Sequence, residues 1–399
     1  MPMQLDVAIV GGGYTGMAAA RALALGGLAV AVLERETLGW GASSRNGGFV
    51  LPGYKVDAEV LVRRYGAERA RQLWDFSLEA LGFVERLVRE ESIDCDLRKT
   101  GWVSLAAKPG HMKALEASSR VLADRFQHPT TLLDREALAG EIGSARYFGG
   151  VLDPAALALH PLRYFNGLAA AASRAGAGAI EHCAVERIEF ASGGFTLQTS
   201  RGPLNARNVL VATNGYGGRL ERPLAARVVP VGSYIVATAP LAEDLAARLV
   251  PRGRVLSDTK NLLYYFRVWD RRLVFGGRAS FAPDADAASR AILARGIAEV
   301  YPELARVELE HAWGGTLGFA VDHMPHAGIF SGVHHSVAYA GHGVALASYL
   351  GHRMGELIAG GGAPPPVWGL PFRRIPFYSG DPWFLPLAAA YYRAMDWLT

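Results

Sequence analysis

A glycine-rich turn between two apolar runs limits the fold of this chain more than any other feature of its 399 residues. Residues 5–10 form a short apolar run with one acid, as expected of a strand buried on both faces of a parallel sheet. The turn 11–16 follows directly, and residues 17–25 are rich in Ala, Leu and Met, which favour a helix. A second apolar run, 28–33, ends at Glu34. The order of strand, glycine turn, helix, strand and acid predicts a dinucleotide site.

Each glycine of this turn has a separate physical task. Gly11 permits the tight turn, Gly13 lets the backbone approach a pyrophosphate, and Gly16 lets helix and strand pack closely. The helix N-terminus offers N–H groups and a positive dipole end to that phosphate. Glu34 lies about 20 residues after the first glycine, where a carboxylate accepts hydrogen bonds from the adenosine ribose and disfavours a 2′-phosphate. The motif therefore predicts FAD or NAD rather than NADP, and its predicted contacts are Gly11, Gly13, Tyr14, Thr15, Gly16, Glu34 and Arg35.

Three later segments favour FAD over NAD, and the first of them directly follows the second predicted strand. Residues 39–48 combine small residues, hydroxyls, an arginine and backbone N–H groups in one irregular stretch, which suits a pyrophosphate and a polar ring edge. A glycine-rich surface loop is the alternative interpretation. The predicted cofactor contacts in this stretch are Ser43, Ser44, Arg45, Asn46, Gly47 and Gly48.

The second segment is a predicted strand over 208–213 that ends in Thr213-Asn214-Gly215. Residues 181–190 and a hairpin around 192–194 precede it, and together they are interpreted as the remaining strands of the nucleotide domain. In this interpretation Val185 presents backbone atoms to the adenine. The predicted cofactor contacts at the end of the strand are Thr213, Asn214 and Gly215.

The third segment lies near the C-terminus, where a predicted strand over 336–340 leads into Gly341-His342-Gly343 and a helix over 344–358. No acid is placed to hold a second ribose here. A helix N-terminus aimed at the pyrimidine edge of a flavin would stabilise the negative charge that grows there on reduction, whereas an ordinary strand–helix joint is the alternative. Nucleotide motifs at both ends of the chain imply a cofactor longer than one Rossmann crevice. The predicted contacts are Gly341, His342, Gly343, Val344 and Ala345.

With these segments, the chain resembles the D-amino-acid-oxidase-like family of FAD-dependent oxidoreductases over nearly its whole length. Within that family it is most similar to the γ-glutamylputrescine oxidase-like amine oxidoreductases. The Arg-Asn-Gly-Gly and Gly-His-Gly-Val runs are typical of this branch, while the other motifs mark the wider family. The segments that carry the resemblance are 43–48, 264–267, 273–278, 313–316, 322–328 and 341–345.

The resemblance implies an α/β plus α+β architecture, in which a Rossmann-like FAD-binding domain is combined with a discontinuous mixed-sheet substrate domain. The helical stretch 58–91 and the alternating runs 228–239 and 262–278, with a hairpin tip at Asp270-Arg271, agree with such a second domain. The implied ranges are 1–56, 145–222 and 313–370 for the FAD-binding domain, 57–144 and 223–312 for the substrate domain, and 371–399 for a C-terminal tail.

The activity that the resemblance implies is FAD-dependent oxidation of a primary or secondary amine. A hydride passes from the carbon next to nitrogen to flavin N5, and the imine then hydrolyses in water. The protein needs only to bind the neutral amine, orient its C–H bond and stabilise the reduced ring. The candidate catalytic residues are His342, Tyr265, Arg267 and His323, and Gly314 is a further predicted FAD contact. A capping role for His342 and core packing for the hairpin aromatics are the alternatives.

Two departures from the family narrow the substrate and the electron acceptor. Relatives that oxidise free α-amino acids carry an arginine after the Trp/Gly segment to clamp the carboxylate, whereas residues 316–319 contain none, unless Arg267 or Arg278 serves instead. Sarcosine-oxidase-like members place a lysine in the second hairpin strand to promote reaction with oxygen, and residues 273–275 contain none. The acceptor is thus oxygen or another electron acceptor. A D-amino-acid or glycine-type oxidase and a non-catalytic flavoprotein subunit stay open as alternatives.

The two cysteines and the charge balance exclude other functions. Neither Cys95 nor Cys183 lies where relatives attach FAD covalently, so the resemblance implies non-covalent FAD. Neither the cysteines nor the histidines show metal-type spacing, and we predict no metal. The net charge of +4 is spread along the chain without a basic run, which argues against nucleic acid as a partner.

The N-terminal pattern, the length of the apolar runs and the C-terminal tail bear on where the protein resides. No signal-peptide pattern follows Met1, and no apolar run reaches the roughly 20 residues that span a bilayer. We therefore expect a cytoplasmic protein without membrane contact. The tail 371–399 is rich in aromatic residues and proline. We expect it to pack simply against the body, and a cover over the active site, a subunit contact or a membrane contact are the alternatives.

Overall fold

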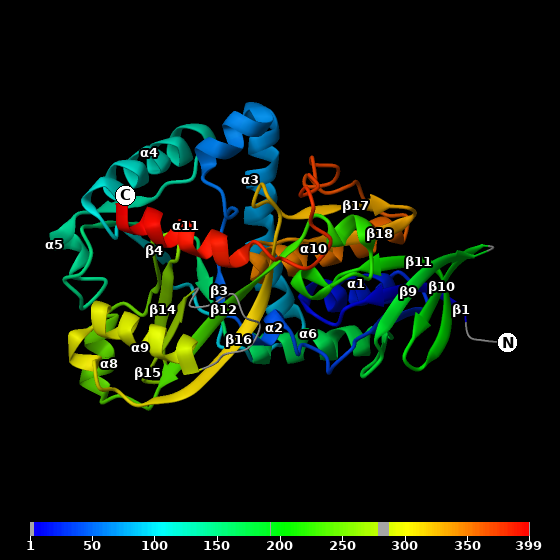
Figure 1. The fold of residues 1–399 in the computed structure, drawn as a ribbon, viewed down its shortest axis with the longest axis horizontal. Helices are drawn as coiled ribbons and strands as arrows, with labels where there is room; N and C mark the ends of the chain where they lie inside the picture. The colour runs from blue at the N-terminus through cyan, green and yellow to red at the C-terminus, as the bar shows by residue number, and fades with distance from the viewer. Residues whose placement is uncertain (1–3, 192, 278–286, 399) are drawn as a thin grey trace.

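Two large sheets organise the chain, and the computed structural model describes residues 4–191, 193–277 and 287–398 of it. Figure 1 shows the sheet with the N-terminal strand on the right and the other sheet on the left. The first sheet contains β1 (Gln4–Val10), β2 (Val30–Leu33), β8 (Gly178–Ile180), β9 (Val185–Ala191), β10 (Gly194–Thr199), β11 (Gly202–Val211), β17 (His326–Phe330) and β18 (Val333–Val337). A separate two-stranded pair joins β3 (Phe49–Val50) to β7 (Leu157–Ala158).

β1 lies inside the first sheet, between β11 and β2, and both pairings are parallel. Val7 and Ile9 belong to one buried cluster, whereas Ala8 and Val10 belong to a second cluster. Because side chains alternate along a strand, these clusters lie on opposite faces of the sheet. The prediction of a parallel strand buried on both faces is confirmed.

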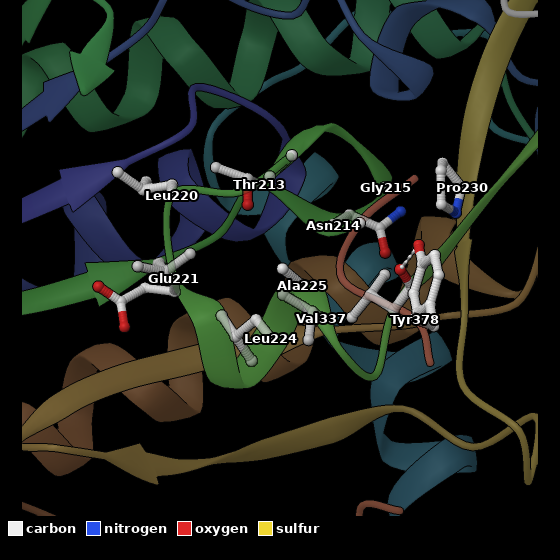
Figure 2. Close-up of a pocket in the computed structure, with 15 residues that line it drawn as sticks. Thr213, Asn214, Gly215, Leu220, Glu221, Leu224, Ala225, Pro230, Val337 and Tyr378 are labelled. Atoms are coloured by element: carbon white, nitrogen blue, oxygen red, sulfur yellow. Dashed lines mark hydrogen bonds between the residues drawn. The ribbon is translucent and has the colours of Figure 1, made fainter. Parts of the chain in front are cut away.

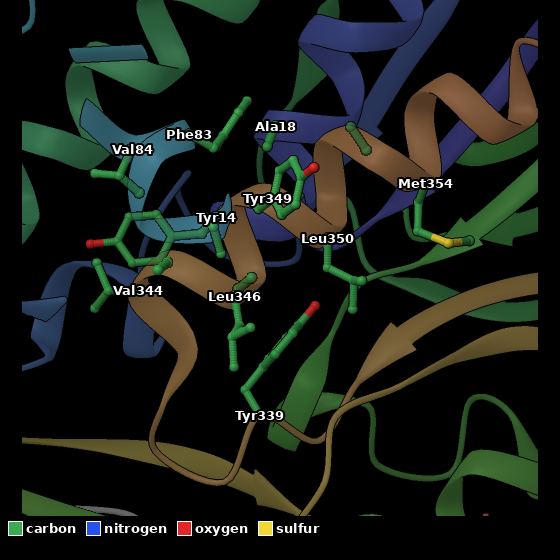
Figure 3. Packing of buried hydrophobic residues seen from close by; sticks show 14 of the residues in the cluster. Tyr14, Ala18, Phe83, Val84, Tyr339, Val344, Leu346, Tyr349, Leu350 and Met354 are labelled. Carbon is green, nitrogen blue, oxygen red and sulfur yellow. The ribbon is translucent and has the colours of Figure 1, made fainter. Parts of the chain in front are cut away.

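α1 (Tyr14–Leu25) packs closely against α10 (Gly343–Ile358) on one face of this sheet. Small residues allow the contact, since a Cβ added to Gly351 would lie 2.3 Å from the Thr15 carbonyl oxygen. The same face carries α3 (Ala58–Glu90) and α6 (Pro161–Arg174), both in contact with this pair. Figure 3 shows part of the shared core, which includes Tyr14, Ala18, Phe83, Val84, Tyr339, Val344, Leu346, Tyr349, Leu350 and Met354.

The second sheet follows the order β16-β12-β15-β14-β13-β4-β6-β5. Phe266 and Phe275 are fully buried in a core that also includes residues of α8 and α9, on one face of this sheet. The strands are β4 (Trp102–Leu105), β5 (Thr131–Leu133), β6 (Gly150–Asp153), β12 (Val229–Thr238), β13 (Val255–Asp258), β14 (Tyr264–Trp269), β15 (Arg272–Gly277) and β16 (Leu309–Phe319). The helices beside it are α4 (Pro109–Phe126), α5 (Arg135–Leu138), α8 (Glu243–Leu249) and α9 (Ala287–Val300).

The hairpin predicted within 262–278 is confirmed as β14 and β15. Its tip residues Asp270 and Arg271 have φ of 48° and 56°. Two successive left-handed residues match the twist of a two-residue hairpin turn. Arg278 lies outside the described residues.

Some predicted strands are longer than the observed ones: β2 begins at Val30 instead of residue 28, and β11 ends at Val211 instead of Thr213. Residues 336–340 were predicted to be a strand, but β18 ends at Val337, because Ala338 and Ala340 adopt left-handed φ values of 70° and 53°. Residues 181–184 precede β9 as a loop, in which the Cys183 amide donates to the Glu34 carbonyl. Contacts between distant segments, which local patterns do not reveal, bend the chain after β18 and before β9.

The long helix predicted over 58–91 is confirmed as α3, with a kink at Gly66, where φ is 76°. The strands do not divide between the sheets at the residues predicted for the domains. β6 and β16 hydrogen-bond within the second sheet, although 145–222 and 313–370 were predicted for the FAD-binding domain. The domain ranges therefore stay a prediction.

The remaining elements are short connections and the C-terminal helix. They are α2 (Ala42–Arg45), η1 (Asn214–Tyr216), α7 (Arg222–Ala225), η2 (Pro302–Leu304) and α11 (Leu385–Leu398). In Figure 1, α11 runs from the region of α10 toward α4, across the middle of the molecule. Within the described ranges, no helix is both long and apolar enough to cross a membrane.

Candidate functional site

At the glycine positions of the first turn there is no room for a side chain. Gly11 has φ of 108°, and a Cβ added there would lie 2.9 Å from the Ala212 carbonyl oxygen. A Cβ on Gly16 would lie 2.0 Å from the Gly11 carbonyl oxygen, so α1 can begin this close to β1 only at glycine. Gly13 caps α1 without a side-chain hydrogen bond. The N-terminus of α1 is thus shaped by backbone, although one of its amides, that of Tyr14, donates to Ser43 Oγ.

Glu34 stands beside this turn at the end of β2. Its Oε2 accepts from the Gly12 amide at 2.7 Å, and its Oε1 accepts from the Glu36 amide at 2.9 Å. A carboxylate has about four acceptor positions, so two amides leave capacity for hydroxyl donors. Arg35, in contrast, is half exposed and ion-pairs with Glu36 on the surface. Val185 begins β9 just after the loop that bonds to the Glu34 backbone.

Residues 39–48 fold against the first turn, and part of them is the one-turn helix α2, where an irregular stretch was expected. Ser43 Oγ accepts from the Tyr14 amide at 2.9 Å. Asn46 Nδ2 donates to the carbonyls of Ala42 and Ser43, while its Oδ1 accepts from the Gly48 amide at 2.8 Å. Asn46 therefore fixes the backbone path that leads into Gly47 and Gly48, and Ser44 Oγ donates to the Gly39 carbonyl.

Arg45 joins this segment to the second sheet. Its guanidinium lies 4.6 Å from the centre of the Trp40 ring, and its Nη1 donates to the Gly314 carbonyl at 3.4 Å. Trp313 Nε1 donates back to the Arg45 carbonyl at 3.0 Å. Trp40 and Trp313 were not among the predicted site residues, and only the tertiary contact assigns them to the site.

The structure resolves which face of the β14–β15 hairpin looks toward these loops. Tyr265 lies on the face opposite the α9 core, and its hydroxyl is 2.9 Å from Ser233 Oγ. Gly276 leaves room for the ring, since a Cβ there would lie 2.3 Å from Tyr265 Cζ. On the other side, a Cβ added to Gly47 would lie 3.2 Å from the same ring. Ser233 was missed by the sequence analysis, although the alternation of β12 could have found it.

Arg267 shares this face and is only 7% exposed. Its Nη2 donates to the Leu159 carbonyl at 2.9 Å and would lie 2.9 Å from a Cβ on Gly48. Its Nε is buried without a hydrogen-bond partner. Burial lowers the pKa of Arg267 to about 10, which leaves it charged at neutral pH. A buried guanidinium with a spare donor, beside Gly48, is suited to bind an anionic or carbonyl group.

The second glycine turn positions the N-terminus of α10. Gly341 has φ of 95°, and the His342 amide donates to the Tyr339 carbonyl at 3.0 Å. His342 is half-buried at the N-cap position, but its side chain makes no capping hydrogen bond, which argues against the capping alternative. Tyr339 also bonds to Thr15 through its hydroxyl, at 2.7 Å. The two glycine turns, far apart in sequence, therefore meet in one place.

The loop Thr213-Asn214-Gly215 follows β11 of the first sheet and contacts β16 of the second sheet. Asn214 Oδ1 accepts from the Ala338 amide at 3.0 Å, and a Cβ on Gly215 would lie 2.8 Å from the Leu317 backbone. Figure 2 shows a pocket that this loop lines together with Glu221, Leu224 and Tyr378. Burial raises the pKa of the Glu221 carboxyl.

The histidines of the C-terminal half, among them His323, have different surroundings. His323 has φ of 60° and lies edge-on to Phe319, at 5.6 Å between ring centres. His326 is buried, stacks on Phe372 and bonds to Asp322, so it serves packing. Burial lowers the pKa of His335 to about 3. Among the residues that the structure describes, no group of three or more His, Cys, Asp or Glu could hold a metal ion.

Comparisons with known proteins agree with this geometry. A family model described as FAD dependent oxidoreductase matches residues 6–357. The chain belongs to this family. FAD is accordingly its cofactor, and the side-chain-free turn, the helix N-terminus and Glu34 fit the adenosine and pyrophosphate of FAD.

Several relatives resemble the chain over most of its length. It is 36% identical to the "Probable oxidoreductase OrdL" of Rhizobium meliloti (strain 1021), with 89% of this chain and 83% of the relative covered. It is 33% identical to the gamma-glutamylputrescine oxidoreductase of Escherichia coli (strain K12), with 98% and 92% covered. The solved structure of glycine oxidase from Geobacillus kaustophilus shares the fold, with a TM-score of 0.76, 21% identity, and 94% and 98% covered. The predicted fold class and family are confirmed.

Proposed function

We propose that the protein oxidises a primary or secondary amine at the carbon next to nitrogen. The observation that carries this proposal is the set of side chains on one face of the second sheet. This face lies opposite α8 and α9 and is called the inner face. Tyr265 and Ser233 offer two hydroxyls 2.9 Å apart there, and residues 316–319 of β16 supply no arginine for an α-carboxylate. The likeness to a gamma-glutamylputrescine oxidoreductase over 98% of the chain supports an amine substrate.

FAD, when bound, supplies the hydride acceptor, and we propose that both glycine turns hold it. The backbone at Val185 meets the adenine, Glu34 accepts from the ribose, and the N-terminus of α1 holds the pyrophosphate. Arg35, which is half exposed beside Glu36, is a further proposed contact at this adenosine end. The proposed contacts toward the flavin are Ser43, Ser44, Arg45, Asn46, Gly47, Gly48, Thr213, Asn214, Gly215, Gly314, Gly341, Gly343, Val344 and Ala345.

The residues around the ring have three separate tasks. The N-terminus of α10 and the His342 side chain provide positive potential where negative charge grows on reduction. Tyr265 and Ser233 orient the amine through hydroxyl hydrogen bonds, which position a C–H bond without needing a nucleophile. Arg267 holds the polar remainder of the substrate, and His323, which lies edge-on to Phe319, is a further candidate on the substrate side.

We further propose that FAD is bound without a covalent bond. Both cysteines are free and buried, and burial raises the pKa of the Cys95 thiol to about 11, which makes Cys95 a poor nucleophile. Free thiols also support a cytoplasmic location. The two sheets support a division into an FAD-binding and a substrate domain.

A second candidate is oxidation of an amino acid, and Arg267 is the observation that favours it. Its unpartnered Nε would donate a hydrogen bond to a substrate carboxylate, beside the Nη2 that donates to the Leu159 carbonyl. In this case the arginine that binds the substrate carboxylate would come from β14 instead of β16.

Anaerobic bleaching of the flavin absorbance separates these candidates. The purified holoprotein is mixed with a panel of alkylamines, acylated diamines, glycine and D-amino acids, and oxygen is then admitted. Bleaching by amines but not by amino acids is the expected result. Bleaching by amino acids alone would establish the second candidate. A flavin that can be photoreduced but is bleached by no compound would instead indicate a non-catalytic flavoprotein.

A further inference from the structure

The C-terminal helix α11 is anchored at both ends, and the first anchor lies on the inner face of the second sheet. Leu385 and Tyr378 are buried in a cluster with Val231 of β12 and Phe319 of β16. Tyr378 also donates its hydroxyl to the Val228 carbonyl at 2.8 Å. Val231 precedes Ser233 by two residues, so it lies on the same face of β12 as Ser233. The tail therefore packs on the face of β12 that carries Ser233.

The second anchor is a carboxylate that ties the end of α11 to the loop before β14. Asp396 Oδ1 accepts from the Asn261 amide at 2.7 Å and from its Nδ2 at 2.9 Å, and Oδ2 accepts from the Leu262 amide at 2.9 Å. This loop leads directly into β14, which carries Tyr265. Three hydrogen bonds to one charged carboxylate form a strong, directional attachment.

The distance between the anchors fits a helix that crosses the end of the sheet. Tyr234 of β12 and Tyr264 of β14 both pair with Gly277 of β15, so Val231 and Leu262 lie near the same end of the sheet. β12 and β14 are separated by β15, or about 10 Å. The helix from Leu385 to Asp396 is about 16 Å long, enough to pass across this end. Figure 1 shows α11 in this crossing position.

The spacing of residues on α11 determines which side chain faces inward between the anchors. Leu385, Ala389, Tyr392 and Asp396 follow each other at three or four positions, so they share one face of the helix. Leu385 and Ala389 are buried, and Asp396 makes the second anchor. Tyr392 is half-buried between them, and its ring lies edge-on to that of its neighbour Tyr391, which is 61% exposed, at 5.4 Å between ring centres. The helical spacing therefore places Tyr392 on the face of α11 that carries both anchors.

We propose that Tyr392 determines substrate specificity by forming the outer wall of the amine-binding site. This inference rests on the proposed amine oxidation. The ring stands across from Tyr265 and Ser233 and contacts the part of the amine remote from the reacting nitrogen. It admits a slender alkyl chain and rejects a chain that is bulky at its remote end. Tyr392 takes no part in the chemical step, because it acts only on the remote part of the substrate.

The test compares two amines with the same reacting group, butylamine and 4-phenylbutylamine. The anaerobic rate of flavin reduction is measured for the protein and for Tyr392→Ala, Tyr392→Phe and the matched control Tyr391→Ala. Tyr392→Ala is expected to raise the rate ratio of the bulky to the slender amine about tenfold, a usual size for a steric pocket change. Tyr392→Phe and Tyr391→Ala are expected to keep the original ratio. An unchanged ratio in Tyr392→Ala would overturn the proposal.

A second readout does not need turnover. Quenching of the bound flavin's fluorescence by iodide measures how open the site is, and Tyr392→Ala and Asp396→Ala are expected to increase it at least twofold, with Tyr391→Ala unchanged. If no amine reduces the flavin in any of these proteins, the proposed function fails, while quenching still decides whether Tyr392 is a wall. Equal quenching in all four proteins, with FAD content retained, would contradict the wall.

Discussion

The two sheets offer their ligands different chemical groups. At the first sheet, Gly11, Gly13 and Gly16 leave room, and backbone amides at the start of α1 face the ligand. At the second sheet, the side chains of Tyr265 and Arg267 project from one strand toward the same loops. A diphosphate is the same in every FAD molecule and can be bound by main chain. A substrate varies between enzymes and needs side chains that can vary with it.

The largest expected effect comes from filling the backbone site. Gly16→Ala places a Cβ 2.0 Å from the Gly11 carbonyl oxygen, so β1 and α1 must separate. We expect a loss of roughly 3 kcal/mol or more in stability, and a protein purified largely without FAD. FAD content and the thermal midpoint measure both effects.

Gly110→Ala is the matched control, because a Cβ there meets nothing within 4 Å. It should keep full FAD content and lose no stability, since alanine is the better helix former. If Gly16→Ala also kept its FAD, the backbone account of the first sheet would be wrong.

A smaller effect is expected from a side chain of the second sheet. Arg267→Lys keeps a positive charge but loses the planar set of donors that reaches Leu159. We expect kcat/KM for the amine to fall about tenfold to a hundredfold with FAD content unchanged, because orientation is lost but the cofactor is not. Steady-state kinetics and flavin absorbance test this. If Arg267→Lys instead lost FAD but kept normal turnover per bound flavin, Arg267 would bind the cofactor. The assignment of cofactor binding to the first sheet and substrate binding to the second would then be wrong.

The smallest effect is a pair of opposite pH dependences. Burial lowers the pKa of His335, in the first sheet, from 6.5 to about 3, so the unfolded chain binds more protons and stability is lost as the pH falls below 6.5. Burial raises the pKa of Asp258, in the second sheet, from 3.8 to about 6, so stability is instead lost as the pH rises from 3.8 to 6.

Thermal midpoints between pH 4 and 6.5 measure both slopes. His335→Phe should flatten the rise of stability with pH, and Asp258→Asn should make that rise steeper, each by up to about 1.4 kcal/mol per pH unit. His311→Asn is the control, since this histidine is 57% exposed. Slopes that change in the same direction in both variants would contradict the assignment.

Much of the nucleotide end could be predicted from sequence because its parts are contiguous. The strand, the glycine turn, α1 and Glu34 all lie within one short stretch, and their periodicity and spacing are visible there. The hairpin tip at Asp270-Arg271 could likewise be predicted, because its pattern also lies within one short stretch. The largest errors occurred at Ala338 and at residues 181–184, where backbone amides donate to Asn214 and Glu34 instead of pairing with a strand. Such bonds join distant segments and leave no local pattern.

The sequence by itself determined the family, the cofactor and the backbone cradle for its phosphates. Only the tertiary structure decided that Tyr265 and Arg267 face the loops and that Ser233 pairs with Tyr265. It also decided that α11 crosses the end of the second sheet. The physical reason is that strand alternation defines two faces but does not say which one is covered. That choice depends on the helices that pack against the sheet, here α8 and α9 on the opposite side.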